Sequence, residues 1–320
     1  MTAQPIHSSD QLIERAIAIA REGRKKRVVV AAAQDIDVID AMSQAEAHGF
    51  LQGILVGDAE LIRKLAGEQG ISIDHLELID KTDVGAAAHA AVTIASEGGA
   101  DAIMKGFLPT SALLKVVLDK QYSLRGENTL SHCAVLDIPG YHKLLNFTDG
   151  GMVVRPDHEQ KFQILENAVM VGRALGLSPV KVALSAATDR LSERMPHTLS
   201  DMDNIIQPAI ERMADIAIQG PLSFDLATSK RAAEIQKASG PVIGDADIYL
   251  VDSIEEGNIV AKALIQFAQA VFAGVIMGAR VPVSLVSRTD TVKNKKASLA
   301  LACVIADYYQ QHQLWQGRGK

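Results

Sequence analysis

Short apolar runs alternate with helix-like stretches along most of the chain, and this alternation is what most restricts its fold. Runs of strand type occupy residues 27–34, 51–57 and 102–105, and the Ala-rich stretch 84–98 is one of the helical patterns between them. Repeated β-α-β order produces parallel strands joined by helices that cover both faces of a sheet. Only 4% of the residues are aromatic, so Ala, Val, Ile and Leu must fill the core, as is typical of buried parallel strands. We therefore predict an α/β fold with largely parallel sheets.

The pattern changes in the middle of the chain. Residues 133–138, 144–147 and 152–154 are predicted to form short strands in an antiparallel patch or a crossover between domains. Regular order then resumes with a helix that Asp157 and Gln160 begin by a capping-box pattern. Further strands are predicted near 76–79, 182–184, 216–219, 248–251 and 275–277, and a last helix over 294–311. A chain of 320 residues exceeds the size at which one core stops growing, so we expect two domains with a boundary near residue 148.

Composition excludes several classes of protein. The formal net charge of −6 argues against a nucleic-acid-binding surface, which is normally basic. No run of about 18 uninterrupted apolar residues occurs, so no membrane span is expected. Residues 1–10 are polar and contain no apolar signal core, so we expect a cytoplasmic protein. Cys133 and Cys303 form no CxxC pair and are expected to be buried, reduced thiols.

Familiar catalytic motifs do not occur in the sequence. There is no G-x-x-x-x-G-K-[ST] loop, no G-x-G-x-x-G after a strand and no G-x-S-x-G elbow. P-loop and dinucleotide-binding enzymes therefore have no support. The nine histidines are scattered, so each is expected to be structural or exposed rather than a metal ligand.

One positive signal lies where the predicted strand ends at Lys105. Gly106 lets the backbone turn, and Thr110 or Ser111 is predicted to cap the helix that follows. Hydroxyls and free N–H groups at a helix start form an anion site, and Lys115 lies about one turn along, within reach of the same anion. An ordinary capped helix with an exposed lysine explains the same residues, and chemistry alone leaves both interpretations open.

A second signal is the run Ser287-Arg288-Thr289-Asp290-Thr291, which directly follows an apolar strand. Ligands of open α/β sheets bind at the carboxyl ends of strands, and the planar guanidinium of Arg288 suits phosphate. The alternative is a helix start capped by Asp290 or Thr291, with Arg288 on the surface. Two such turns in one chain favour a ligand that carries phosphate.

A third segment, Gly257-Asn258, is predicted to open a helix after the strand at 248–251 and to offer amides to a ligand. A plain turn is the alternative. These three segments together resemble the phosphate acetyl/butyryl transferase family. Supporting matches are Lys105-Gly106, the helix start from Thr110 to Lys115, Leu130-Ser131-His132, residues 220–225 and Ala273-Gly274-Val275. The resemblance spans residues 27 to 310 and is closer to phosphate butyryltransferases, and to the transferase half of fused enoyl-CoA hydratase/phosphate acetyltransferase proteins, than to dedicated acetyltransferases.

The resemblance implies a fold similar to isocitrate and isopropylmalate dehydrogenases, with two α/β domains, an interdomain cleft and a homodimer. The first domain would comprise residues 1–148 plus 285–320, and the second residues 149–284. It also implies an acyltransferase that moves a short acyl group, acetyl to butyryl, reversibly between coenzyme A and inorganic phosphate in a ternary complex. Its partners would be acyl-CoA, phosphate and acyl phosphate, with coenzyme A as substrate and no cofactor or metal.

Such a reaction needs a base for the thiol, donors for the oxyanion and cations for phosphate. By resemblance, Ser287 is the active-site serine and Arg288 binds the phosphoryl or carbonyl oxygens. Lys115 stands where acetyltransferases carry a phosphate-binding arginine, and Thr110 and Ser111 match the phosphate-cradling turn. The resemblance adds further substrate-binding candidates: Lys105, Gly106, Ser131, His132, Gly257, Asn258 and Gly274.

Two positions depart from the acetyltransferases. Asn294 stands where they carry the aspartate proposed as the thiol base, and a neutral amide does not accept a proton at neutral pH. Asp290 is closer to Ser287 in sequence. Both residues are catalytic candidates by position, and the base is left unassigned. A second family arginine, on the helix after Gly257-Asn258, has no counterpart among residues 265–267.

Two alternatives stay open. One is a regulatory homologue, catalytically weak, that retains an acyl-phosphate or coenzyme A site. The other is a metal- and NAD-dependent decarboxylating dehydrogenase, because that class shares the fold. The dehydrogenase would need clustered aspartates for a divalent metal, and the sequence shows no such cluster.

Overall fold

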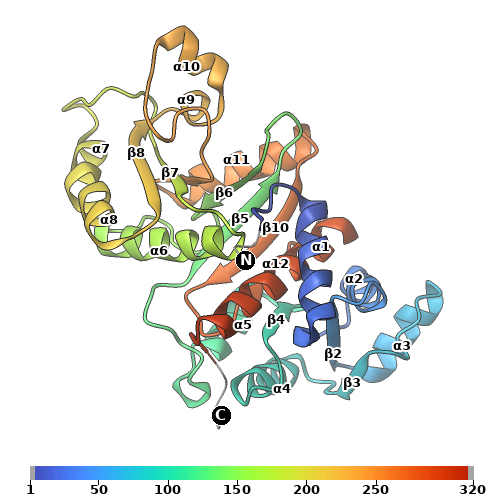
Figure 1. The fold of residues 1–320 in the computed structure, drawn as a ribbon. Coiled ribbons are helices and arrows are strands. Elements are labelled where there is room, and N and C mark those ends of the chain that lie inside the picture. Colours follow the sequence, from blue (N-terminus) through green and yellow to red (C-terminus); the bar gives the residue numbers. More distant parts are fainter. Residues whose placement is uncertain (1–3, 316–320) are drawn as a thin grey trace. The chain divides into compact units, whose positions relative to one another are not determined.

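The computed structural model describes residues 4–315 and confirms a mixed α/β fold with mostly parallel strands (Figure 1). By the density of their internal contacts the residues form two compact units. Among the described residues, the first unit comprises residues 9–127 and 271–315, and the second comprises residues 4–8 and 128–270. These limits differ from the predicted domain boundaries at 148/149 and 284/285, which stay a prediction. Residues 1–3 and 316–320 of the predicted first domain lie outside the described residues.

The first unit contains strands in the order β3-β2-β1-β4-β11-β10. All neighbouring pairs are parallel except β10 with β11. The strands are β1 (Lys26–Ala31), β2 (Leu51–Gly57), β3 (Glu77–Asp80), β4 (Ala102–Lys105), β10 (Val271–Met277) and β11 (Val283–Ser284). The helices are α1 (Ser9–Ile19), α2 (Ile36–Ala47), α3 (Ala59–Glu68), α4 (Val84–Ser96), α5 (Thr110–Val117) and α12 (Val292–Gln311). Two further turns of helix are η1 (Ala20–Arg24) and η2 (Lys120–Tyr122).

Helix α12 is the central packing element of the first unit. Most of its side chains are buried, and it contacts β10 and β1 as well as α1 and α2. Thr291 caps it by accepting the N–H of Asn294 at 3.2 Å, which confirms one of the two predicted caps. The chain's C-terminal segment therefore completes a core that begins with the N-terminal strands.

The second unit contains strands in the order β5-β6-β9-β7-β8. They are β5 (Ser131–Asp137), β6 (Leu144–Thr148), β7 (Val180–Ser185), β8 (Ile216–Leu222) and β9 (Ile248–Leu250). Its helices are α6 (His158–Ala174), α7 (Pro196–Asp201), η3 (Met202–Ile206), α8 (Gln207–Arg212), α9 (Phe224–Thr228), α10 (Lys230–Gln236) and α11 (Ile254–Phe267). Strands β5 and β6 are antiparallel, which confirms the predicted patch, and the capping box of Asp157 and Gln160 is present at α6.

The predicted strand at 152–154 is wrong. These residues form bends because the carboxylate of Asp149 accepts the N–H groups of Gly151 (2.7 Å), Met152 (2.9 Å) and Val153 (3.2 Å). Backbone donors that are bound to a side chain are not available to a strand ladder.

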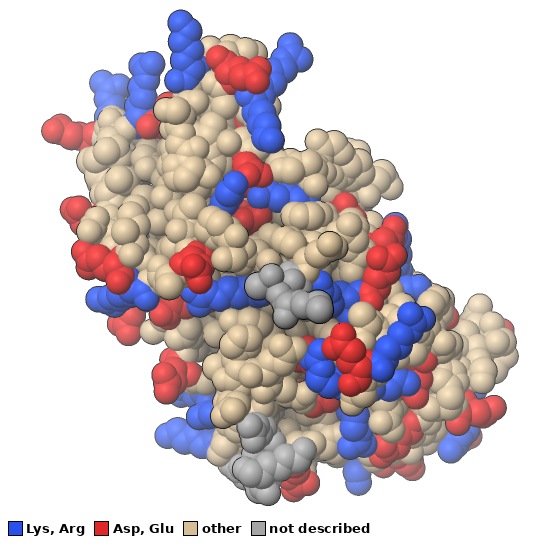
Figure 2. Space-filling model, in the orientation of Figure 1, with Lys and Arg blue, Asp and Glu red and all other residues tan. Residues whose placement is uncertain are grey.

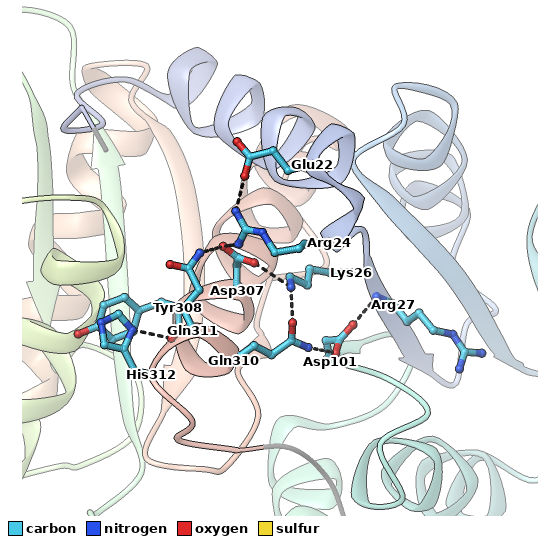
Figure 3. Close-up of polar contacts among 10 residues, drawn as sticks. All are labelled: Glu22, Arg24, Lys26, Arg27, Asp101, Asp307, Tyr308, Gln310, Gln311 and His312. Atoms are coloured by element: carbon cyan, nitrogen blue, oxygen red, sulfur yellow. Dashed lines mark hydrogen bonds and ion pairs between the residues drawn. The ribbon is translucent and has the colours of Figure 1, made fainter. Parts of the chain in front are cut away.

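A buried ion network lies where β1 begins (Figure 3). Lys26 is 1% exposed, and its Nζ lies 2.9 Å from Asp307 Oδ1 on α12. Arg24 also pairs with Asp307, and Gln310 accepts a hydrogen bond from Lys26. Gln310 in turn donates to Asp101 at 2.6 Å. The network joins α12 to the amino ends of β1 and β4.

The charged surface is mixed in sign. Figure 2 shows basic and acidic side chains intermingled on the face it displays. Within residues 4–315, no helix is long and apolar enough to span a membrane.

Candidate functional site

The carboxyl ends of three neighbouring strands define the candidate site. Strand β4 pairs in parallel with β1 on one side and with β11 on the other. Parallel strands end at the same edge of a sheet, and ligands of open α/β sheets bind there. The loops that follow β1, β4 and β11 lead into α2, α5 and α12; Asp35 and Ser287 lie in the first and last of these loops, and Lys105 is the last residue of β4.

Gly106 allows the turn after β4 to lie directly on the turn after β1. Its N–H donates to Ala31 O at 3.0 Å, and the next N–H, of Phe107, donates to Ala32 O at 2.6 Å. A Cβ at Gly106 would lie 2.7 Å from Ala31 O and closer still to Ala32 O. Ala32 itself has φ of 58°, a left-handed conformation that is unfavourable for a residue other than glycine. The predicted turn at Gly106 is present, and it requires glycine for space.

Lys105 points beneath this turn. Its side chain is buried, and Nζ donates to Gly106 O at 3.2 Å and to Leu108 O at 3.3 Å. Burial lowers the pKa of Lys105, and the positive charge of Arg288 lowers it further. The carboxylate of Asp35 acts in the opposite direction. The same ammonium therefore interacts with charges from the loops after β1 and β11.

The start of α5 differs from the prediction. Pro109 occupies the N-cap position, no side chain caps the helix, and Thr110 and Ser111 are its first helical residues. The prediction that Thr110 or Ser111 caps the helix is wrong, because both lie one or two positions too late for their hydroxyls to reach the first free amides. Thr110 is half-buried, whereas Ser111 and Lys115 are exposed.

The loop after β11 is held by Asp290. Its Oδ2 accepts the N–H of Ser287 at 2.6 Å, and the Ser287 hydroxyl lies 3.1 Å from that of Thr289. The Arg288 guanidinium lies over the Phe107 ring, 4.4 Å from its centroid, as cation–π contacts favour. The structure thus brings the two anion-ready turns predicted from sequence next to each other, and Ser287 and Arg288 remain exposed.

Asn294 and Gly274 join α12 to β10. Asn294 is buried, and its Oδ1 accepts the N–H of Phe272 at 3.1 Å. The N–H of Gly274 donates to Ser298 Oγ at 2.9 Å, and a Cβ there would collide with the carbonyl of Leu285. Both positions therefore have packing roles within the first unit.

Lys295 and Asp37 belong to the site although no sequence motif predicted them. Lys295 is 1% exposed; its Nζ donates to Asp290 O at 2.5 Å and lies 3.5 Å from Asp37 Oδ2. It contributes to the lowered pKa of Lys105, so it belongs to the same cluster of charges. The sequence signal for Lys295 was its position in the first turn of α12, where a positive charge is unfavourable next to the positive end of the helix dipole. A lysine at this position indicates a compensating interaction elsewhere.

Ser131 and His132 lie in the second unit at the start of β5. The Ser131 hydroxyl is fully buried and accepts from Asn167 Nδ2 at 2.9 Å. Burial lowers the pKa of His132 to about 4, so its ring is neutral at pH 7. A Cβ at Gly151 would lie 3.0 Å from that ring.

The prediction that Gly257-Asn258 opens a helix is wrong. Helix α11 begins at Ile254 with Ser253 as N-cap, so the Gly257 N–H already donates to Ser253 O at 3.2 Å. A Cβ at Gly257 would lie 2.7 Å from Gly150 Cα, and Asn258 Nδ2 donates to Gly150 O at 3.0 Å. Four candidates of the second unit, Ser131, His132, Gly257 and Asn258, therefore lie in β5 or α11, and two of these, Gly257 and Asn258, contact the loop at Gly150 directly. The Asp-Gly-Gly sequence at 149–151 was the signal for this loop.

The first unit therefore presents an exposed serine and arginine above a buried lysine, at the edge where parallel strands end. Cations in such a position can bind an anionic group, and an exposed hydroxyl beside them can donate to a neighbouring oxygen. Among residues 4–315, no three His, Cys, Asp or Glu side chains are grouped as a metal site.

Comparisons with known proteins match nearly the whole chain. The model of the phosphate acetyl/butaryl transferase family matches residues 81–303. A protein of Bacillus subtilis described as a probable phosphate butyryltransferase is 39% identical over 287 residues, covering 89% of this chain and 95% of its own length. The phosphate butyryltransferase of Clostridium acetobutylicum is 35% identical, covering 88% and 93%. The crystal structure of a branched-chain phosphotransacylase from Enterococcus faecalis has a TM-score of 0.78 at 31% identity, covering 88% and 99%.

Proposed function

Because this chain belongs to the phosphate acetyl/butyryl transferase family, we propose that it transfers a short acyl group reversibly between coenzyme A and inorganic phosphate. The acyl groups are acetyl to butyryl, and the substrates are acyl-CoA, phosphate and acyl phosphate. The observation that carries the proposal is that Ser287 and Arg288 lie beside the Lys105 turn in a chain similar over its length to phosphate butyryltransferases.

The reaction proceeds in a ternary complex. The thiolate of coenzyme A attacks the carbonyl carbon of the acyl phosphate, and phosphate leaves. Arg288 binds the phosphoryl or carbonyl oxygens through its planar fork, and Ser287 donates to the oxyanion. The exposure of both side chains supports these roles.

The start of α5 is the proposed phosphate cradle. Thr110, Ser111 and the exposed Lys115 contribute hydroxyls and a point charge, and the free amides of the first turn add donors. Gly106 brings this turn close to β1.

The remaining candidates act through the loops they hold. Ser131, His132, Gly257, Asn258 and Gly274 have backbone or side-chain contacts each within its own unit, which supports a role in shaping the substrate-binding loops of that unit. Asp290 orients Ser287, and Asn294 fixes the start of α12.

The family resemblance also supports proposals on localisation, oligomeric state, cofactor requirement and domain bounds. We propose a cytoplasmic homodimer that takes coenzyme A as substrate and needs no cofactor or metal. Domains of residues 1–148 plus 285–320 and of residues 149–284, with the likeness to isocitrate and isopropylmalate dehydrogenases, belong to the same proposal.

Two assays with acetyl-, propionyl- and butyryl-CoA test the activity. One follows arsenolysis of the acyl-CoA, and the other follows release of the coenzyme A thiol when phosphate is the acceptor. We expect turnover with at least one of the three, and one methylene in the acyl pocket to change kcat/KM by about 10- to 200-fold. Ser287→Ala and Arg288→Ala should each lower turnover sharply in a folded protein. Absence of turnover with all three acyl groups favours the regulatory alternative. Activity that EDTA removes and a divalent metal restores favours the dehydrogenase alternative.

A further inference from the structure

One buried lysine differs from the others. Five lysines are buried among the described residues, and four of them have a carboxylate oxygen within 4 Å. These four pairs are Lys26 with Asp307 (2.9 Å), Lys143 with Asp247 (2.6 Å), Lys161 with Asp201 (2.5 Å) and Lys295 with Asp37 (3.5 Å). Lys105 is the fifth; within residues 4–315 it has no such ion pair and donates only to two neutral carbonyls of its own turn.

A buried ammonium without a counter-ion is expensive, so the equilibrium shifts toward the neutral amine. The charges around Lys105 come from three elements. Arg288 and Lys295 disfavour its protonation, while Asp35 and Asp290 favour it, and burial is the largest influence. The net result is a lowered pKa, which shifts Lys105 toward the neutral amine, the form that can accept a proton.

The place of Lys105 fits this chemistry. It ends β4, between the loops of β1 and β11, and the turn it supports contacts Arg288 through Phe107. Asn294, at the position where acetyltransferases carry an aspartate, is a neutral amide bound to the N–H of Phe272. Asn294 cannot accept a proton at neutral pH, whereas Lys105 is a buried amine that has no carboxylate partner in the described part of the chain.

We propose that Lys105 is the general base that removes the proton from the coenzyme A thiol. This rests on the proposed function. The amine lone pair takes the thiol proton, and the sulfur keeps the bonding electrons. The thiolate then forms the C–S bond as the C–O bond to phosphate breaks, and phosphate leaves with that electron pair. In the reverse direction the Lys105 ammonium returns the proton to the leaving thiolate.

Steady-state kinetics of Lys105→Met and Lys105→Arg test the proposal. A positioned base contributes about 10²- to 10⁴-fold, so kcat should fall by that factor in both variants. Arginine keeps the positive charge but cannot accept a proton, so it should not restore turnover. The loss should shrink at high pH, where the thiol ionises without help. Lys64→Ala, an exposed lysine on α3, is the control and should behave as wild type.

Chemical restoration of the amine gives a readout that packing alone does not produce. The Lys105→Cys variant is treated with 2-bromoethylamine, which attaches an aminoethyl group to the new thiol. Cys133 and Cys303 are buried, and burial raises the pKa of Cys133 to about 12, so neither should react. We expect turnover to return, with the acidic limb of the kcat/KM profile moved to lower pH because a thioether amine is less basic than lysine. Wild type treated in the same way is the control.

The outcomes separate three cases. If Lys105→Arg keeps its kcat and only the KM for phosphate or acyl phosphate rises, Lys105 is an anion anchor and the base proposal is overturned. If Lys105→Cys that carries one added aminoethyl group by mass spectrometry regains no turnover while remaining folded by thermal unfolding, the base proposal is likewise overturned. If wild type is inactive with all three acyl-CoA substrates, the proposed function fails instead.

Discussion

The pair of Lys26 and Asp307 allows a quantitative test of how the first unit is held together. Lys26 is 1% exposed and Asp307 is 3% exposed, so neither charge is solvated by water. Asp307→Asn keeps the shape and removes the negative charge. Lys26 then retains only neutral oxygens, those of Gln310 and of the new amide, as side-chain partners. Breaking one partner of a buried pair costs about 3–5 kcal/mol.

We expect the lower end of that range. Arg24 is the second cation that pairs with Asp307. It is one-third exposed and keeps its ion pair with Glu22 at 2.5 Å, so losing the Arg24–Asp307 contact adds little to the cost in free energy of unfolding. The double change Lys26→Met with Asp307→Leu replaces the pair by apolar groups and should recover most of the loss, because no charge remains buried.

Urea unfolding followed by circular dichroism measures the free energy of unfolding for wild type, for Asp307→Asn and for the double variant. Glu77→Gln is the matched control, since the Arg27–Glu77 pair is exposed at both ends and should be worth under about 1 kcal/mol. If Asp307→Asn costs no more than Glu77→Gln, the reasoning from burial is refuted.

Three further predictions concern other positions. The pKa of His132 falls from 6.5 to about 4 on folding, so between these pH values the unfolded chain binds more protons than the folded chain. The free energy of unfolding should therefore decline by about 3 kcal/mol as pH falls through this range. His132→Gln should flatten this slope in pH-dependent urea unfolding, and an unchanged slope would contradict the burial of the ring. Gly106→Ala should cost more than about 2 kcal/mol and abolish turnover, because its Cβ would meet the carbonyls of the β1 turn, and thermal unfolding that matches wild type would argue against this contact. Gly257→Ala should destabilise through Gly150 to a similar degree, whereas Ala263→Ser, exposed on the same helix, should change thermal stability by less than about 0.5 kcal/mol.

Local pattern predicted the elements well where the backbone depends on local residues. The strands at Leu51–Gly57 and Ala102–Lys105 were predicted with their observed bounds, because glycine or a charged residue ends each apolar run. The strand at 152–154 was wrong because the Asp149 side chain takes the N–H groups that a strand would use. An apolar pattern does not reveal this competition between side chain and sheet.

The candidate site could be predicted only in part, because some of its features depend on segments that are distant in sequence. Ser287, Arg288 and Lys105 could be selected because each follows an apolar strand. The burial of Lys105 and Lys295 could not be predicted from sequence, because it depends on β11 and α12, which come from far along the chain and pack beside β4. Residue type alone favours an exposed lysine at both positions.

The return of the chain to its first sheet has a consequence for synthesis on the ribosome. Strand β4 pairs with β1 on one side and with β11 on the other, and β11 begins only at Val283. Until that segment emerges, a nascent chain exposes the apolar edge of β4 and lacks the helix α12 that covers β1 and β10. Unpaired edges of this kind invite aggregation. Truncations before residue 283 should therefore accumulate as insoluble or chaperone-bound protein, and the site of Lys105 and Arg288 is assembled last.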